Sequence, residues 1–152
     1  MTARSSPERQ LASFIAKYTP AIATLAHAVL ATMRARLPGA VELVYDNYNA
    51  LAIAFGPTER TAEAIFSITV YPRWTSLFFV HGTDLPDPHK LLKGSGTTIR
   101  HIVLTDAAML DTPAVRSLMA RALERAATPL DSTRPNRVVI KSVSAKQRPR
   151  RP

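Results

Sequence analysis

The spacing of apolar residues changes at Pro38-Gly39, and this change most constrains how the chain can fold. Before it, Leu11, Phe14, Ile15 and Tyr18 recur at the intervals of one helical face. After it, apolar and polar residues alternate, and β-branched and aromatic residues dominate, which indicates strands. The chain therefore begins with helices and continues into a sheet.

Two helices are predicted before the change and one near the end of the chain. Ser6-Pro7 and Thr19-Pro20 each combine a capping side chain with a proline suited to the first helical turn. The third helix is predicted to begin after Asp111 or Thr112. These caps place helices on both sides of the strand region.

Five strands and a short edge strand are predicted between and after these helices. They are residues 41–48, 51–55, 64–71, 75–81 and 99–105, with the edge strand at 137–143. Most of the connections are short, which favours antiparallel neighbours over parallel ones. The fold class is therefore α+β, a two-layer domain with a mainly antiparallel five- to six-stranded sheet packed against N-terminal and C-terminal helices.

The length of 152 residues fits one domain, and the charge is uneven along it. The net charge is +9, but seven cations and no acid lie from Arg134 onward, so the rest of the chain carries only +2. We expect a flexible N-terminus at 1–6, a single domain at 7–143 and a disordered basic tail at 144–152. Basicity belongs to the tail and not to the body.

Composition also bounds the chemistry and the compartment. There is no cysteine, which excludes disulfides, thiolate metal sites and thiol nucleophiles. No signal-peptide pattern and no stretch of roughly 18 apolar residues is present. We expect a cytoplasmic protein without a membrane partner.

The segment 82–98 contains three glycines and two prolines, and its second half is a candidate anion site. Glycines let successive backbone N–H groups point into one concavity, which a lysine, hydroxyls and an arginine could complete. The candidates are Lys93, Gly94, Ser95, Gly96, Thr97 and Arg100. The spacing is not that of a Walker A loop. The simpler interpretation, that the glycines only turn the chain into the next strand, stays open.

A polar and aromatic cluster near the ends of the first strands is a second candidate. Its candidate ligand-binding residues are Asn47 and Trp74, and the cluster also contains Tyr45, Tyr71 and other Asx residues. Aromatic walls with a few amides suit a small-molecule pocket, but Asx residues also suit hairpin turns. The pocket interpretation gains if this cluster and the glycine-rich segment meet at one edge of the sheet.

No catalytic or metal-binding signature accompanies these candidates. The histidines at 27, 81, 89 and 101 show neither HExxH nor a two-histidine-carboxylate spacing, and no GxSxG is present. We therefore expect no catalytic residues, no metal and no cofactor.

Three segments carry a resemblance to a known family. They are ELVYDNYNALAIAFGP at 42–57, IFSITVYPRWTSLFFVHG at 65–82 and LPDPHKLLKGSGTTIRHI at 85–102. With the flanking helices, residues 8–126 resemble the bacterial domain of unknown function 1801 family, whose YdhG-like members include a frataxin-like iron chaperone. The resemblance implies a sheet packed on helices and allows a role in iron delivery. However, the carboxylates of this chain are scattered and form no acidic ridge in sequence, although iron prefers oxygen ligands.

These observations favour a non-enzymatic binding module that takes a small anionic ligand or a protein partner through the glycine-rich segment. The alternatives are an iron chaperone of the frataxin type and weak, non-specific nucleic-acid association through the tail. The tail cations are Lys146, Arg148, Arg150 and Arg151, and no aromatic residue interleaves with them. A solvated, solubilising terminus is the simpler interpretation of the tail. An uncovered sheet edge would also permit a homodimer.

Overall fold

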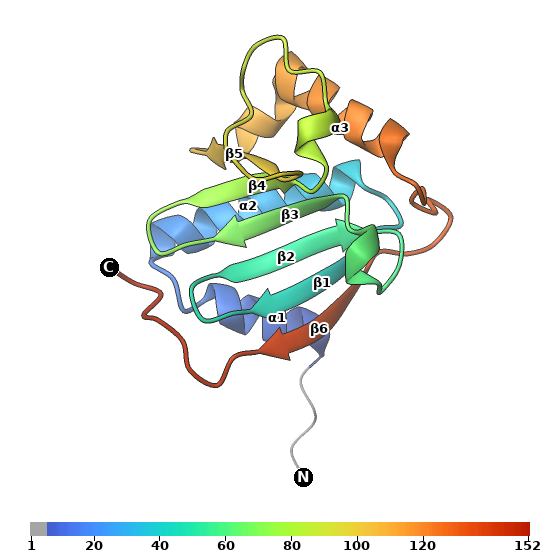
Figure 1. Cartoon of the computed structure of the whole chain (residues 1–152). Coiled ribbons are helices and arrows are strands. Elements are labelled where there is room, and N and C mark those ends of the chain that lie inside the picture. Colours follow the sequence, from blue (N-terminus) through green and yellow to red (C-terminus); the bar gives the residue numbers. More distant parts are fainter. Residues whose placement is uncertain (1–5) are drawn as a thin grey trace.

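The computed structural model describes residues 6–152, which fold into three α-helices, six strands and three short 3-10 helices (Figure 1). The helices are α1 (Pro7–Ile15), α2 (Pro20–Arg36) and α3 (Pro113–Arg125). The strands are β1 (Val41–Asp46), β2 (Leu51–Gly56), β3 (Phe66–Val70), β4 (Thr75–Phe79), β5 (Arg100–Leu104) and β6 (Arg137–Val143). The 3-10 helices are η1 (Thr61–Glu63), η2 (Gly82–Asp84) and η3 (Ala107–Asp111). Of the flexible N-terminus predicted at 1–6, residues 1–5 lie outside the described residues.

The first two helices begin where their caps predict. The Ser6 hydroxyl accepts the backbone N–H of Arg9 at 3.2 Å, and the Thr19 hydroxyl accepts that of Ile22 at 3.5 Å. Each satisfies a donor that the helix itself leaves without a partner. Thr112 precedes α3 without such a bond, since its hydroxyl donates to the carbonyl of Met109. The predicted cap positions of α1 and α2 are confirmed.

The six strands form one open sheet in the order β5-β4-β3-β2-β1-β6. Every neighbouring pair is antiparallel except β1 and β6, which run parallel with a register shift between Val44 and Tyr45. The β1–β2 and β3–β4 turns lie at one end of the sheet, here called the turn end. α3 returns the chain to the opposite end, where β1 begins, so β6 starts beside Val41 and follows the same direction. The predicted α+β sheet is confirmed, and it is mixed.

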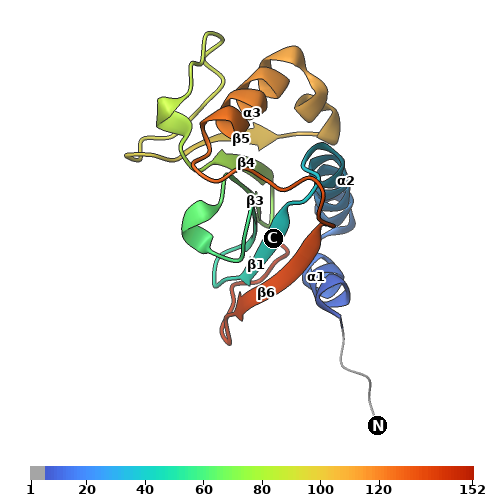
Figure 2. The same cartoon turned by 90° about the vertical axis from the view of Figure 1, so that its right-hand side faces the viewer.

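One face of the sheet carries the main hydrophobic core. Side chains from all three helices pack there against the buried face of the sheet, and the Phe66 and Phe79 rings meet edge to face at 5.5 Å. Figure 2 shows α1 and α2 together on one side of the sheet. A smaller cluster on the other face contains Val41, Leu43, Ala54 and Ala64. The domain thus has the predicted two layers, with most of the second face left without a helix.

Residues 144–152, predicted as a disordered tail, have a defined path along the turn end of the sheet. The backbone N–H groups of Ser144 and Arg148 donate to the carbonyls of Asp46 and Tyr48, each at 2.8 Å. The Arg150 side chain is buried against Asp46. Composition alone predicts that this basic segment is solvated, because composition does not show that the carboxylate of Asp46 in β1 is buried nearby.

No helix in residues 6–152 is long and apolar enough to cross a bilayer.

Candidate functional site

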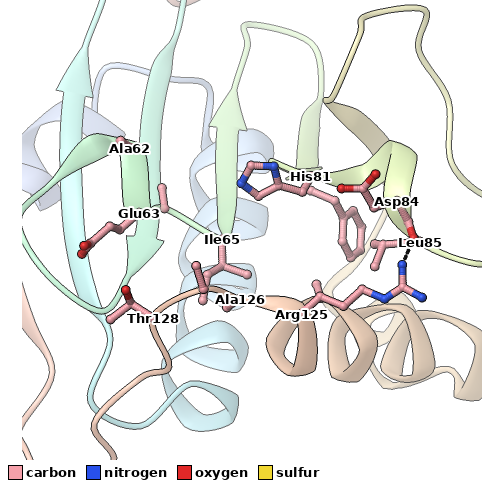
Figure 3. Close-up of a pocket in the computed structure, with 13 residues that line it drawn as sticks. Ala62, Glu63, Ile65, His81, Asp84, Leu85, Arg125, Ala126 and Thr128 are labelled. Carbon is pink, nitrogen blue, oxygen red and sulfur yellow. Dashed lines mark hydrogen bonds between the residues drawn. The ribbon is translucent and has the colours of Figure 1, made fainter.

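A pocket of about 290 Å³ opens at the end of the sheet opposite the turns (Figure 3). Three segments that are distant in sequence line it, at 62–65, 79–85 and 122–128. The first joins η1 to β3, the second leaves β4 through η2, and the third is the end of α3 and the residues after it. The pocket therefore exists only in the folded chain.

The walls of the pocket are mainly apolar. The apolar lining includes Ile65, the fully buried Phe79, Leu85, Ala122 and Ala126. Ala122 lies in the last turn of α3, and Ala126 is the first residue after the helix. Because both side chains end at a methyl group, the space that a leucine would fill remains open.

Polar groups gather around the rim. Arg125 donates from Nη1 to the carbonyl oxygen of Asp84, which ties the end of α3 to η2. In Figure 3, His81 and Asp84 lie on one side of the hollow, and Thr128 lies across from them. Glu63, the half-buried last residue of η1, also lines the pocket, and its carboxylate accepts from the Thr58 hydroxyl. Both charge signs are thus represented around an apolar interior.

This combination of groups suits a small organic molecule. Ligand sites are concave and mostly apolar, with a few polar groups that fix orientation. An apolar cavity of about 150 Å³ accommodates benzene, so this pocket can hold a ring with a substituent. The chemistry available here is burial of an apolar body with a hydrogen-bonding group at the rim.

The candidate anion loop is built differently from an N–H concavity. Arg100 donates from Nη1 to the carbonyls of Gly96 at 2.6 Å and Ile99 at 2.8 Å. The backbone of Lys93 pairs with that of His101 as an antiparallel bridge beside β5. The loop thus presents carbonyl oxygens to its arginine, while Ser95 and the rest of the glycine-rich stretch are exposed. Anion binding by this loop stays a prediction.

The second candidate cluster lies at the turn end of the sheet. Trp74 stacks on Tyr71 with ring centroids 4.4 Å apart and remains 42% exposed. Asn47 lies in the β1–β2 turn, where its carbonyl accepts from Arg150. The loop at 93–100 adjoins the start of β5, which lies at the other end of the sheet. The two predicted groups are therefore not brought into one pocket.

The structure also bears on the alternatives drawn from the tail and from metal binding. Across residues 6–152, no three His, Asp or Glu side chains gather closely enough to hold a metal ion. Of the four tail cations, Arg150 is buried, whereas Lys146, Arg148 and Arg151 are exposed. Iron delivery and nucleic-acid association remain predictions.

In comparisons with known proteins, no family model, no curated protein and no solved structure matches this chain. The resemblance to the domain of unknown function 1801 family therefore stays a prediction. No local sequence motif contains Arg125 or Thr128, so the sequence analysis missed both as candidate site residues.

Proposed function

We propose that this domain is a non-enzymatic binding module whose ligand is a small amphipathic anion with an apolar body. The observation that carries the proposal is the apolar pocket lined by Phe79, by Ala122 of α3 and by Ala126, which follows the helix. Burial of apolar ligand surface contributes about 25 cal/mol per Å², so an apolar body is the natural occupant.

Arg125 supports an acidic group on this ligand. Within residues 6–152 its guanidinium makes one hydrogen bond, from Nη1 to the carbonyl of Asp84. Its remaining N–H groups are therefore free for a carboxylate, which arginine binds with two parallel hydrogen bonds. We therefore retain the prediction of an anionic ligand. We assign its binding to the pocket beside η2 instead of to the glycine-rich loop.

We propose that the polar groups of the rim bind the ligand rather than catalyse a reaction on it. A nucleophile needs a base within hydrogen-bond reach, and the base needs a third group to orient it. Among the described residues, no side chain is hydrogen-bonded to the imidazole of His81. The proposed role of His81 is therefore to contact the ligand at the rim.

Thermal shift and ligand-observed NMR with a panel of small carboxylates test this proposal. The panel pairs benzoate, phenylacetate and hexanoate with their neutral amides and includes inorganic phosphate. We expect the carboxylates with apolar bodies to raise the melting temperature, the amides to do so less, and phosphate to have no effect.

Two substitutions on the same helix supply the matched control. Ala122→Leu should fill the hollow and abolish ligand binding, whereas Ala120→Leu, on the exposed side of α3, should leave it unchanged. Arg125→Gln should remove the preference for carboxylates over amides. Binding that survives Ala122→Leu, or a panel that gives no shift at all, would contradict the proposal.

A further inference from the structure

A buried carboxylate at the turn end of the sheet forms a site distinct from the pocket. Asp46, the last residue of β1, is 0% exposed, and its side chain lies on the helix-facing side of the sheet. Lys17 donates from Nζ to its Oδ2 at 2.7 Å, and Arg150 donates from Nη2 to its Oδ1 at 2.9 Å. The Lys17 side chain is 40% exposed, but that of Arg150 is only 3% exposed. Arg150 is thus the cation that fills the buried side of the site.

The groups around the guanidinium of Arg150 are hydrogen-bond acceptors. Besides bonding Asp46, Nη2 donates to the carbonyl of Asn47 at 2.5 Å, and Nη1 donates to that of Tyr48 at 3.3 Å. The ring of Tyr18 lies 5.8 Å from the guanidinium carbon and adds a cation–π contact. Guanidinium has five N–H donors and no acceptor, so this arrangement matches arginine in both charge and shape.

The receptor groups belong to the body of the domain and are fixed there without the tail. Asn47 is held by a bond from its N–H to the carbonyl of Ala50 at 3.0 Å. The Tyr18 hydroxyl donates to the carbonyl of Val70 at 2.6 Å and accepts from the N–H of Leu51 at 3.1 Å. The site is therefore preorganised for an arginine side chain.

The tail, in contrast, is attached mainly through polar contacts. The residues on either side of Arg150 are exposed, and the Nε of Arg150 is buried without a partner in the described chain. The rest of the tail is held by hydrogen bonds from its N–H groups and the Gln147 side chain to the same turn. The side chains of Gln147 and Arg151 also bond Lys17, and the Arg148 guanidinium lies over the Tyr48 ring. Such a segment can leave without opening the hydrophobic core.

We propose that Asp46, the carbonyls of Asn47 and Tyr48 and the ring of Tyr18 form an arginine-binding site for a basic peptide. The tail occupies this site in the same chain through Arg150 and competes with any arginine-bearing peptide of similar sequence. A short connection gives an attached ligand an effective concentration on the order of 1 mM, so the intact chain excludes dilute peptides. Loss of Arg150 opens the site to a peptide in solution.

The test uses the full-length chain carrying Arg150→Ala and a fluorescent peptide with the sequence of residues 144–152. Fluorescence anisotropy should show saturable one-to-one binding to Arg150→Ala and binding about tenfold or more weaker to the unmodified chain. A peptide carrying Arg150→Lys should bind roughly tenfold less tightly, because lysine lacks the planar fork. A peptide carrying Arg148→Lys is the control and should lose much less, since the Arg148 side chain is exposed and its guanidinium only lies over the Tyr48 ring, 5.6 Å from the ring centroid.

Other outcomes overturn the proposal. Equal binding to both chains, or no loss from the Arg150→Lys peptide, would mean that charge alone attracts the peptide to the surface. Equal losses from the two peptide substitutions would mean that the site does not select Arg150. Absence of binding to an Arg150→Ala chain with native circular dichroism would also refute it. If Arg150→Ala does not fold, the full-length Arg150→Lys chain, which keeps the charge, replaces it. Tighter peptide binding to Arg150→Lys than to the unmodified chain would then support the proposal, and equal binding or no binding would refute it.

Discussion

Arg150 donates to Asp46 at 2.9 Å across 104 residues of sequence, and both side chains are buried. Replacing Asp46 with asparagine removes the negative charge and leaves two cations facing a neutral amide. Because Arg150 can withdraw into water with the tail, the cost is limited to the lost charged hydrogen bonds, about 1.5–3 kcal/mol in the free energy of unfolding. Urea denaturation of Asp46→Asn measures it. Glu59→Gln, which removes an exposed partner of Arg137, is the control and should change little.

Acid should weaken the domain through the same carboxylate. Burial would raise the pKa of Asp46, but hydrogen bonds from Lys17 and Arg150 hold it below its ordinary value of 3.8. A depressed carboxyl pKa contributes stability that is present above 3.8 and is lost as the pH falls through the folded-state pKa. The free energy of unfolding of the unmodified chain should therefore fall more steeply below pH 3.8 than that of Asp46→Asn. Parallel curves would contradict this assignment.

Glu42 should respond to pH in the opposite sense. Burial raises its pKa above the ordinary 4.5, although Arg34, which bonds it at 2.8 Å, opposes the rise. A raised pKa means that the folded state binds the proton more tightly, so stability recovers as the pH falls through the folded-state pKa toward 4.5. Relative to Glu42→Gln, the unmodified chain should gain stability over that interval. Urea denaturation of both chains across it measures the change, and a relative loss would show that Arg34 outweighs burial.

Gly39 and Gly96 should differ sharply in their tolerance of a side chain. Gly39 has φ +84°, and a Cβ there would lie 1.9 Å from the carbonyl oxygen of Asp131. Gly39→Ala should therefore cost at least about 1–3 kcal/mol from backbone strain, with the steric clash adding to it. At Gly96 the nearest atom is the Ile99 carbonyl oxygen at 3.8 Å, so Gly96→Ala should stay within about 0.5 kcal/mol. Thermal denaturation of both variants compares the two positions directly.

The hydroxyl of Tyr18 should stabilise two strands at once. It bonds the carbonyl of Val70 and the N–H of Leu51, both buried. Tyr18→Phe leaves these groups without a partner and should cost about 1–3 kcal/mol. Burial also raises the pKa of Tyr18 above 10.0, so the stability that its neutral hydroxyl contributes is lost as the pH rises from 10.0 through the folded-state pKa. Tyr18→Phe should be less sensitive to alkali, and equal sensitivity would show that another group dominates.

The sequence predicts the parts of this fold that are encoded locally. The caps at Ser6 and Thr19 and the strand at 137–143 appear where the pattern places them, because capping and alternation depend on neighbours in the chain. The direction of β6 is a different matter. Its parallel pairing with β1 depends on the end of the sheet at which α3 and the following loop leave the chain. The residues of β6 carry no information about that position.

The candidate site was much less accessible to prediction. Asn47 and the glycine-rich loop are distinctive in sequence, yet they lie at opposite ends of the sheet. The pocket instead depends on small side chains such as Ala122 and on Arg125, which are ordinary residues in an amphipathic helix. Arg150 shows the same limit, since a basic tail gives no sign that a buried carboxylate in β1 will bind one of its arginines.

The pairing of β6 with β1 has a consequence for biosynthesis. Residues leave the ribosome in chain order, so β1 to β5 can assemble while β6 is still being made. Until residues 137–143 emerge, one side of β1 presents unpaired N–H and C=O groups, the kind of edge that recruits strands from other chains. The edge of β1 therefore stays open to aggregation until β6 has left the ribosome, and a chaperone that covers β1 would protect the chain until then.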